Sequence, residues 1–323
     1  MFSLSDGALY ASEVGLWIDS SRRRTRCYVS HGHGDHARPH ARVVTSVANA
    51  RVCRARFGAR GGDITFEEHA LGEPWTLGEH RLELFSAGHI LGSTQLLIEG
   101  ERGRFVYTGD FKLERSHTAE PPEVKSCDEL LMECTYGHPQ FRFPAREEIA
   151  AQMVGFARAA LEADKVPVFS AYTLGKAQEA LAILGFGGVP VCAHPGVAAL
   201  AKVYEDAGVR LPAYSRYDAD AFDGEAALVW PASGQPLPRT AGGRRTRTAA
   251  LTGWIHTRRG PRNVDAGFAL SDHADFPALL RYVELAQPRK VWLTHGFPEF
   301  AGELRRRGVD AQYLTANAQL RLF

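Results

Sequence analysis

The densest group of chemically capable side chains lies in the segment SHGHGDHARPH, which holds four of the thirteen histidines. His31 and His33 stand two residues apart, so in an extended loop both imidazoles point the same way and can bind one divalent ion. Asp35 and His36 follow where we expect the chain to enter a helix, and they can face a second ion. An H-x-H-x-D-H string arises by chance in roughly one chain per thousand of this length. A metal site is therefore favoured over a surface histidine cluster.

Three further candidate ligands each end a strand-like run, where loops present functional groups. His89 closes LELFSAGH, Asp110 closes FVYTGD and His295 closes KVWLTH. A carboxylate at Asp110 could bridge two ions, as a binuclear hydrolytic centre requires. Each histidine alone is more often a packed or hydrogen-bonded side chain than a ligand. Beside the histidine-rich loop, the ligand interpretation is the stronger one.

The order of the motifs resembles that of a known fold. SHGHGDH, AGHILGSTQ and YTGDF are similar to the metal-binding motifs of the metallo-β-lactamase fold, and GLWIDS resembles its first motif, with Asp19 as the supporting acid. MECTYG, SDHADF and LTHG resemble the further motifs of the nuclease branch that carries the β-CASP insertion. FSAYTLGKAQE resembles the characteristic segment of that insertion. The compact length is similar to that of the bacterial ligase-associated DNA 3′ exonucleases.

The resemblance implies an α/β protein with a four-layer αββα metallo-β-lactamase fold and an inserted β-CASP α/β domain. The expected domains are residues 1–140, an insertion at 141–262, and a returning part at 263–323. The resemblance also implies two divalent ions, Zn²⁺, Mn²⁺ or both. The two ligand sets, with Asp110 between them, would be His31, His33 and His89 for one ion, and Asp35, His36 and His295 for the other.

Catalytic roles follow from the same resemblance. Two divalent ions activate a bridging water and clamp a phosphoryl oxygen, which suits in-line hydrolysis of a phosphodiester. Asp35 belongs to the catalytic set. His273 in SDHADF would give a proton to the leaving oxygen, and Glu133 in MECTYG would hydrogen-bond its other nitrogen. A purely structural pairing is the alternative for Glu133.

Several side chains are candidate partners for substrate phosphates. Residues 226–264 hold seven arginines and no Asp or Glu. Their Gly/Pro/Thr-rich middle, GQPLPRTAGGRRTRT, predicts an exposed loop between the strands ALVWPA and ALTGWIH, with Arg244, Arg245 and Arg247 available to phosphates. A solvated loop without a ligand is an equally good interpretation. Lys176 in LGK and Ser93 in HILGST could add contacts.

The elements that must position these residues follow from pattern and length. With 323 residues, the chain is long enough for two domains or for one large fold with an insertion. Up to about residue 135 it reads as short strands, among them LYASEVGLWID and RLELFSAGH. After Pro144, helical and strand-like segments alternate, which indicates a parallel α/β insertion. The net charge of +1 provides no global basic field, so a nucleic acid would have to be held locally.

Cysteine usage and hydropathy indicate the compartment. The five cysteines are odd in number and form no CxxC pair, so a reducing cytoplasm fits better than a disulfide framework. The N-terminus lacks the basic and apolar regions of a signal peptide. The uncharged run at residues 180–201 is interrupted by glycines and prolines, so we expect no membrane segment.

Four functions compete for this sequence. A metal-dependent DNA exonuclease acting from 3′ ends in DNA repair is favoured by length and by the lack of added RNA-binding modules. An RNA-processing β-CASP ribonuclease is the alternative, since RNA-processing relatives also carry histidine where His295 stands. The insertion and the motifs of Glu133 and His273 disfavour a thioester or lactam hydrolase. An inactive subunit would lack several ligands, and none is missing. The implied partners are DNA that is single-stranded or has 3′ ends, RNA under the alternative, and functionally a DNA ligase and a helicase.

Overall fold

The computed structural model describes residues 2–5, 8–255, 257–258 and 260–314. The chain divides into two compact units. The first, which we call the core unit, comprises Met1–Arg115, Ala119–Arg142 and His273–Phe323, and the second, the insertion unit, comprises Ser116–Thr118 and Phe143–Asp272. The return to the core unit thus falls at residue 273 rather than at the expected residue 263. The cause is a strand, β18 (Ala266–Phe268), which pairs in parallel with the insertion sheet.

The first sheet of the core unit has six strands that follow one another in sequence order. They are β1 (Phe2–Ser5), β2 (Ala8–Ala11), β3 (Leu16–Ile18), β4 (Arg26–Tyr28), β5 (Arg42–Ser46) and β6 (Thr65–His69). β2 and β3 are antiparallel and are joined by a turn, so LYASEVGLWID is a hairpin and not the single strand expected. From β3 to β6 the strands run parallel.

The second sheet has seven strands in the order β20-β19-β11-β10-β9-β8-β7. They are β7 (Trp75–Leu77), β8 (His80–Ser86), β9 (Thr94–Gly100), β10 (Gly103–Tyr107), β11 (Glu129–Cys134), β19 (Lys290–Gly296) and β20 (Asp310–Tyr313). Strands β7 to β10 are antiparallel, whereas β10, β11, β19 and β20 are parallel. The carboxyl ends of β8, β10, β11 and β19 therefore meet at one edge.

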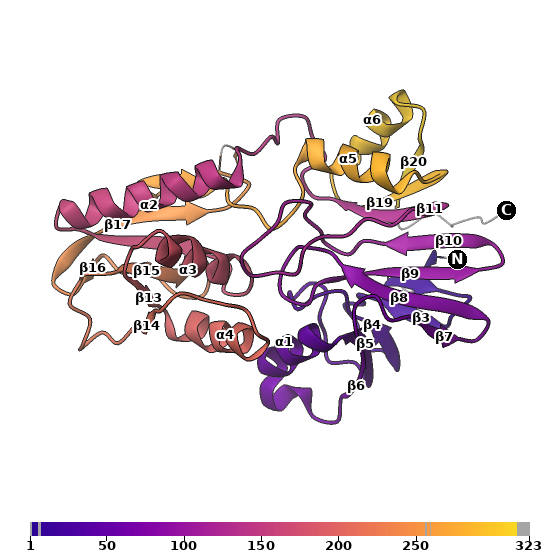
Figure 1. Cartoon of the computed structure of the whole chain (residues 1–323), viewed down its shortest axis with the longest axis horizontal. Helices are drawn as coiled ribbons and strands as arrows, with labels where there is room; N and C mark the ends of the chain where they lie inside the picture. The colour runs from indigo at the N-terminus through magenta and orange to yellow at the C-terminus, as the bar shows by residue number, and fades with distance from the viewer. Residues whose placement is uncertain (1, 6–7, 256, 259, 315–323) are drawn as a thin grey trace. The chain divides into compact units, whose positions relative to one another are not determined.

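Three apolar clusters arrange the core unit in four layers (Figure 1). Between the two sheets pack side chains from both, such as Leu16 and Leu84. Helix α1 (Val47–Phe57) covers the other face of the first sheet through Cys53 and Phe57. Helices α5 (Phe276–Ala286) and α6 (Phe300–Arg306) cover the second sheet. A 3₁₀ turn, η1 (Gly58–Gly61), follows α1. The four layers together form the αββα sandwich of the metallo-β-lactamase fold.

The insertion unit is an α/β layer structure of its own (Figure 1). Its sheet has the order β14-β13-β15-β12-β17-β16, with β18 on β17. These strands are β12 (Val166–Ala171), β13 (Val191–Ala193), β14 (Ser215–Arg216), β15 (Ala227–Pro231), β16 (Thr240–Ala241) and β17 (Arg244–Leu251). Helices α2 (Arg146–Glu162), α3 (Lys176–Phe186) and α4 (Pro195–Asp206) pack on one face of it.

Two local expectations were wrong. Arg244, Arg245 and Arg247 lie in β17, which is paired on both sides, and not in the exposed loop expected for GQPLPRTAGGRRTRT. Gly242 and Gly243, both with positive φ, form the turn from β16 into β17. After His33 the chain makes one helical turn, closed by Ala37 N to the His33 carbonyl at 2.8 Å, and residues 37–41 do not continue it as a helix. Pro39 disfavours helical backbone at the residue before it.

No helix in the described ranges combines the length and apolar character needed to cross a membrane.

Candidate metal centre

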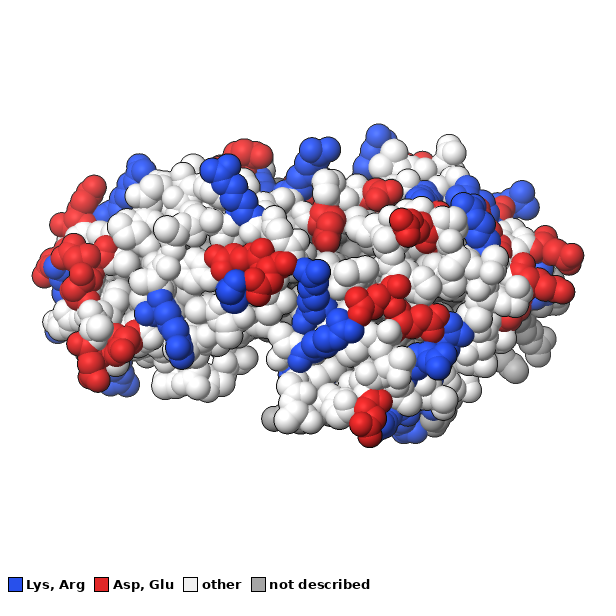
Figure 2. Space-filling view, turned by 60° about the horizontal axis from the view of Figure 1, so that its bottom comes forward, with Lys and Arg blue, Asp and Glu red and all other residues white. Residues whose placement is uncertain are grey.

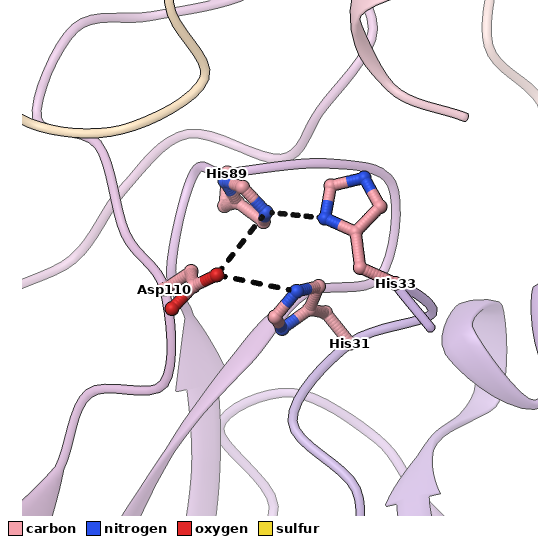
Figure 3. Close-up of side chains that lie close together, drawn as sticks. All are labelled: His31, His33, His89 and Asp110. Carbon is pink, nitrogen blue, oxygen red and sulfur yellow. Dashed lines mark hydrogen bonds and ion pairs between the residues drawn. The ribbon is translucent and has the colours of Figure 1, made fainter. Parts of the chain in front are cut away.

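Four side chains from three loops form a first cluster at the edge where β8 and β10 end. Each of His31, His33, His89 and Asp110 offers a ligand atom, and these four atoms lie within 4.8 Å of one another. His31 Nε2 is 3.5 Å and His89 Nε2 is 4.0 Å from Asp110 Oδ2. His89 Nε2 is also 3.0 Å from His33 Nδ1, so His89 faces both neighbours (Figure 3).

A second cluster shares Asp110 with the first. Ligand atoms of His36, Asp110 and His295 lie within 4.8 Å of one another, and His36 Nε2 is 3.3 Å from Asp110 Oδ2. His295 stands near the end of β19 with φ of 46°, a left-handed backbone that histidine adopts more readily than most residues. One carboxylate thus lies between two groups of imidazoles.

Asp35 belongs to neither cluster in this structure. Its side chain is 78% exposed, and its Oδ2 is 3.9 Å from His36 Nε2. The carboxylate therefore lies beside the second cluster.

Asp19 positions the second cluster through a set of buried hydrogen bonds. Its Oδ2 accepts from His36 Nδ1 at 2.8 Å and from the Tyr107 hydroxyl at 2.9 Å, and its Oδ1 accepts from Ser30 N at 2.7 Å. Because the proton of His36 is held at Nδ1, Nε2 is left to face Asp110. A carboxylate behind a ligating histidine fixes its tautomer and ring orientation in this way.

The side chains of the two clusters fit divalent metal ions, and the hydrogen bonding of His31 supports this. His31 Nδ1 lies 3.0 Å from Ser30 Oγ, whereas its Nε2 is buried and has no hydrogen-bond partner in the described part of the chain. A buried polar atom without a partner is costly in a folded protein. Imidazole nitrogens with a carboxylate are ligands that Zn²⁺ and Mn²⁺ accept. We conclude that these residues are suited to hold such ions.

Electrostatics sets a different charge state at each of three ligand residues. Burial lowers the pKa of His31 well below its usual value, and the charges of His36 and His89 lower it further, so His31 is neutral. Burial alone would raise the pKa of Asp110, but His36 and His273 hold it well below its usual range. Burial alone would lower the pKa of His36, but Asp110 and Asp19 raise it well above its usual value. Asp110 is therefore ionised at neutral pH, the form that binds metal.

Glu133 and His273, which are 140 residues apart in the chain, meet beside the first cluster. Glu133 is fully buried on β11, and its Oε1 accepts from His273 Nδ1 at 2.9 Å and from Phe111 N at 3.0 Å. The His273 ring lies 4.7 Å from the ring of His89. The bond to Nδ1 turns Nε2 of His273 away from Glu133, where it can exchange a proton.

The candidate phosphate contacts have other partners in the structure. Ser93 is 1% exposed, and its Oγ accepts from the backbone N–H groups of His89 and Ile90, both at 3.1 Å, so it shapes the His89 loop. Lys176 is buried, and its Nζ lies 2.8 Å from Asp272 Oδ1. These contacts give no support to the expected phosphate contacts of Ser93 and Lys176.

Two of the three arginines in β17 also contact other side chains. Arg244 pairs with Asp164 at 3.0 Å and with Glu225. Arg247 lies over the Phe156 ring, 4.5 Å from its centroid. A phosphate contact from Arg244, Arg245 or Arg247 stays a prediction.

Sequence reasoning missed Ser30, Tyr107 and Arg56. Ser30 contacts Asp19 and His31, and Tyr107 contacts Asp19. Arg56 Nη1 donates to the carbonyl of Gly32 in the histidine-rich loop. Ser30 and Tyr107 are the first residues of the quoted motifs SHGHGDH and YTGDF, which was the available signal. Nothing in the pattern around Arg56 indicates its contact, because it depends on how α1 packs.

Comparison with known proteins identifies several similar chains. The family model described as "Zn-dependent metallo-hydrolase RNA specificity domain" matches residues 266–318. A relative from Opitutus terrae, named "Probable DNA ligase", is 38% identical over 97% of this chain and 31% of its own length. The "Transcription termination factor FttA" of a Lokiarchaeum is 36% identical over 32% of this chain and 17% of its own. The chain thus spans at most about a third of the length of these two relatives.

Two further relatives extend the comparison. The "RNase J-like protein" of Methanocaldococcus jannaschii is 31% identical over 32% of this chain and 25% of its own length. A solved structure of a protein of unknown function from Enterococcus faecalis V583 has a TM-score of 0.62 at 16% identity. It covers 91% of this chain and 79% of that one, and it shows a common fold.

The layers and the paired histidine clusters define a protein of the metallo-β-lactamase fold. The α/β insertion, the Glu133–His273 pair and the matched relatives make the assignment more specific. The chain belongs to the β-CASP family of metallo-β-lactamase nucleases.

Proposed function

We propose that this protein is a metal-dependent phosphodiesterase that acts as a DNA exonuclease from 3′ ends. The observation that carries the proposal is the pair of ligand clusters sharing Asp110, with the Glu133–His273 pair beside the first of them. A site that hydrolyses phosphodiesters needs a strong nucleophile, a clamp for the phosphoryl oxygens and a proton for the leaving oxygen. Each requirement has a candidate group here.

The chain's own residues divide these tasks. His31, His33 and His89 would hold one divalent ion, and His36 and His295, with Asp35 beside them, would hold the other, with Asp110 between. The ions would activate water and polarise a phosphoryl oxygen. Asp19 keeps His36 in the tautomer that presents Nε2.

His273 would supply the proton to the leaving oxygen. Glu133 accepts from Nδ1 of His273, which stabilises the imidazolium form and directs Nε2 to the reacting group. Arg244, Arg245 and Arg247 remain candidates for phosphate binding.

DNA is favoured as substrate by the "Probable DNA ligase" relative, which matches across nearly the whole chain. The same relative supports a functional association with a DNA ligase in cytoplasmic DNA repair, and the family resemblance adds a helicase. RNA is the second candidate, because the matched family model is described as an RNA specificity domain and another relative is named an RNase J-like protein.

A direct test uses protein reconstituted with Zn²⁺ or Mn²⁺ and strands of one sequence, as DNA and as RNA, labelled at the 5′ or the 3′ end. We expect stepwise release of nucleotides from the 3′ end of DNA. Faster hydrolysis of the RNA strand would favour the ribonuclease instead.

Metal dependence is tested with matched variants. His31→Ala and Asp110→Ala should abolish hydrolysis, whereas His117→Ala, at an exposed histidine of the insertion unit, should not. Elemental analysis should find two ions per chain in the wild type. Full activity in a chelator, with no bound metal, would contradict the proposal.

A further inference from the structure

The strongest local excess of positive charge lies in the core unit. Residues 22–60 hold ten arginines and a single acid, Asp35. On the face drawn in Figure 2, Lys and Arg lie interspersed with Asp and Glu, so no broad basic field covers it. A polyanion would therefore have to be recognised by a local group of arginines.

Three of these arginines contact neighbouring side chains. Arg26 pairs with Glu67 at 2.5 Å, Arg54 pairs with Glu68, and Arg24 lies over the Trp17 ring, 3.6 Å from its centroid. From the other arginines with exposed side chains we select four, which we call the arginine strip: Arg23, Arg38, Arg42 and Arg56. No carboxylate in the described ranges forms an ion pair with Arg23, Arg38 or Arg42.

One end of the arginine strip touches the metal-binding loop. Arg56 Nη1 donates to the carbonyl of Gly32, and a Cβ on Gly34 would lie 3.3 Å from Arg56 Nη2. Burial lowers the pKa of Arg56, the nearby charge of Asp35 raises it and that of Arg38 lowers it. Arg38 and Arg56 are thus neighbours at the rim of the loop that carries His31 and His33.

The other end follows the chain away from the metal centre. Ala41 N donates to the Arg24 carbonyl at 3.0 Å, and Arg42 N donates to the Thr25 carbonyl at 2.9 Å. The segment after Arg38 therefore runs beside the segment that carries Arg23. The backbone positions of Arg23, Arg38 and Arg42 thus lie on two adjacent segments between the ligand loop and the start of β5.

We propose that the arginine strip binds the backbone of a single nucleic-acid strand next to the metal centre. The proposal rests on the function proposed above and names a surface for it. Guanidinium groups bind phosphates with paired hydrogen bonds and stay charged at every physiological pH. A row of such groups with a single nearby acid suits a chain of phosphates and carries no base preference.

The test replaces the three strip arginines other than Arg56, whose guanidinium donates to the Gly32 carbonyl of the metal-binding loop. The strip variant is Arg23→Gln, Arg38→Gln and Arg42→Gln, and it keeps Arg56. The control variant is Arg81→Gln, Arg281→Gln and Arg289→Gln, which removes the same charge from exposed positions of the same unit. Binding of a phosphorothioate-linked single strand is measured from 50 to 200 mM salt. Hydrolysis of bis(p-nitrophenyl) phosphate reports on the metal centre.

We expect the strip variant to bind more weakly and to flatten the log–log salt slope by about 2, since each phosphate contact on a single strand contributes about 0.7. Hydrolysis of the small diester should match the wild type. If the strip variant kept the wild-type slope and affinity, or if the control variant lost as much, the inference would be wrong and the proposed function would stand. A wild type that neither binds nor degrades nucleic acid would overturn the proposed function as well.

Discussion

Asp110 and Asp19 show how two carboxylates of one residue type take different tasks. Asp110 is placed between two groups of imidazoles and lies within 4.0 Å of three of them. Asp19 stands behind His36 and has its oxygens occupied by Ser30, Tyr107 and His36. The first is arranged to meet a cation, whereas the second is arranged to orient a ligand.

Substituting Asp19→Asn should therefore weaken metal binding without removing a ligand. Asn tolerates the left-handed backbone at this position, where φ is 42°, so strain is not introduced. We expect a loss of about 10- to 100-fold in affinity for the ion held by His36, as for other residues that support a ligating histidine. A competition titration with a chromogenic chelator measures it. Wild-type affinity would show that Asp19 does not support metal binding.

Substituting His273→Ala should slow hydrolysis of DNA by about 10²- to 10⁴-fold while both ions stay bound, since a general acid contributes that much. A substrate with a p-nitrophenolate leaving group needs little protonation. The variant should therefore hydrolyse thymidine 5′-p-nitrophenyl phosphate at nearly the wild-type rate. Equal losses on both substrates, or loss of metal, would exclude the proton-donor role.

His40 should make the stability of the core unit depend on pH. Burial lowers the pKa of His40 to about 4, and its Nδ1 accepts from Arg24 N at 3.1 Å. In the unfolded chain the pKa is about 6.5, so the unfolded state binds the extra proton first. Stability should thus fall as pH decreases from about 6.5 towards 4.

The substitution His40→Asn removes that titration and keeps a hydrogen-bond acceptor. Urea unfolding is measured at pH 7 and at pH 4.5 in the presence of a chelator, so that metal release does not contribute. Between these two pH values the free energy of unfolding should decrease less for the variant than for the wild type. Equal decreases would mean that His40 does not titrate as described.

At the scale of elements, helix α5 depends on its N-cap residue, Asp275, which directly precedes it. The Asp275 carboxylate accepts from Ala278 N at 3.0 Å and caps the helix two residues after His273. Asp275→Ala should lower the free energy of unfolding by about 1 kcal/mol, and Asp275→Asn by less, because Asn is also a good cap. Chemical denaturation measures both. Equal losses for the two variants would argue against a capping role.

The histidine-rich loop, the strand ends and the alternation after Pro144 could be predicted because they depend on short-range pattern. Long-range pairing could not. The turn at Gly242 and Gly243 indicated a loop correctly, but the arginines after it gave no sign that β17 is paired on both sides. Asp19 was identified by resemblance, whereas the bond from Tyr107 to Asp19, 88 residues away, depends on how the two sheets pack.

At the scale of the whole molecule, the proposed polarity has a simple consequence. An exonuclease needs a free end, so a circular single strand should resist digestion, whereas the same strand linearised by one cut should be degraded. Gel electrophoresis of the two forms measures it. Rapid cutting of the circle would instead show an endonuclease.

The interrupted order of the second sheet matters while the chain is being synthesised. β11 has buried side chains along most of its length, and its partner β19 is made about 160 residues later, after the whole insertion unit. Until β19 leaves the ribosome, β11 is an open apolar edge, and such edges invite aggregation. β19 also carries His295. Closing the edge and completing the second ligand cluster are therefore one and the same late event in the maturation of the nascent protein.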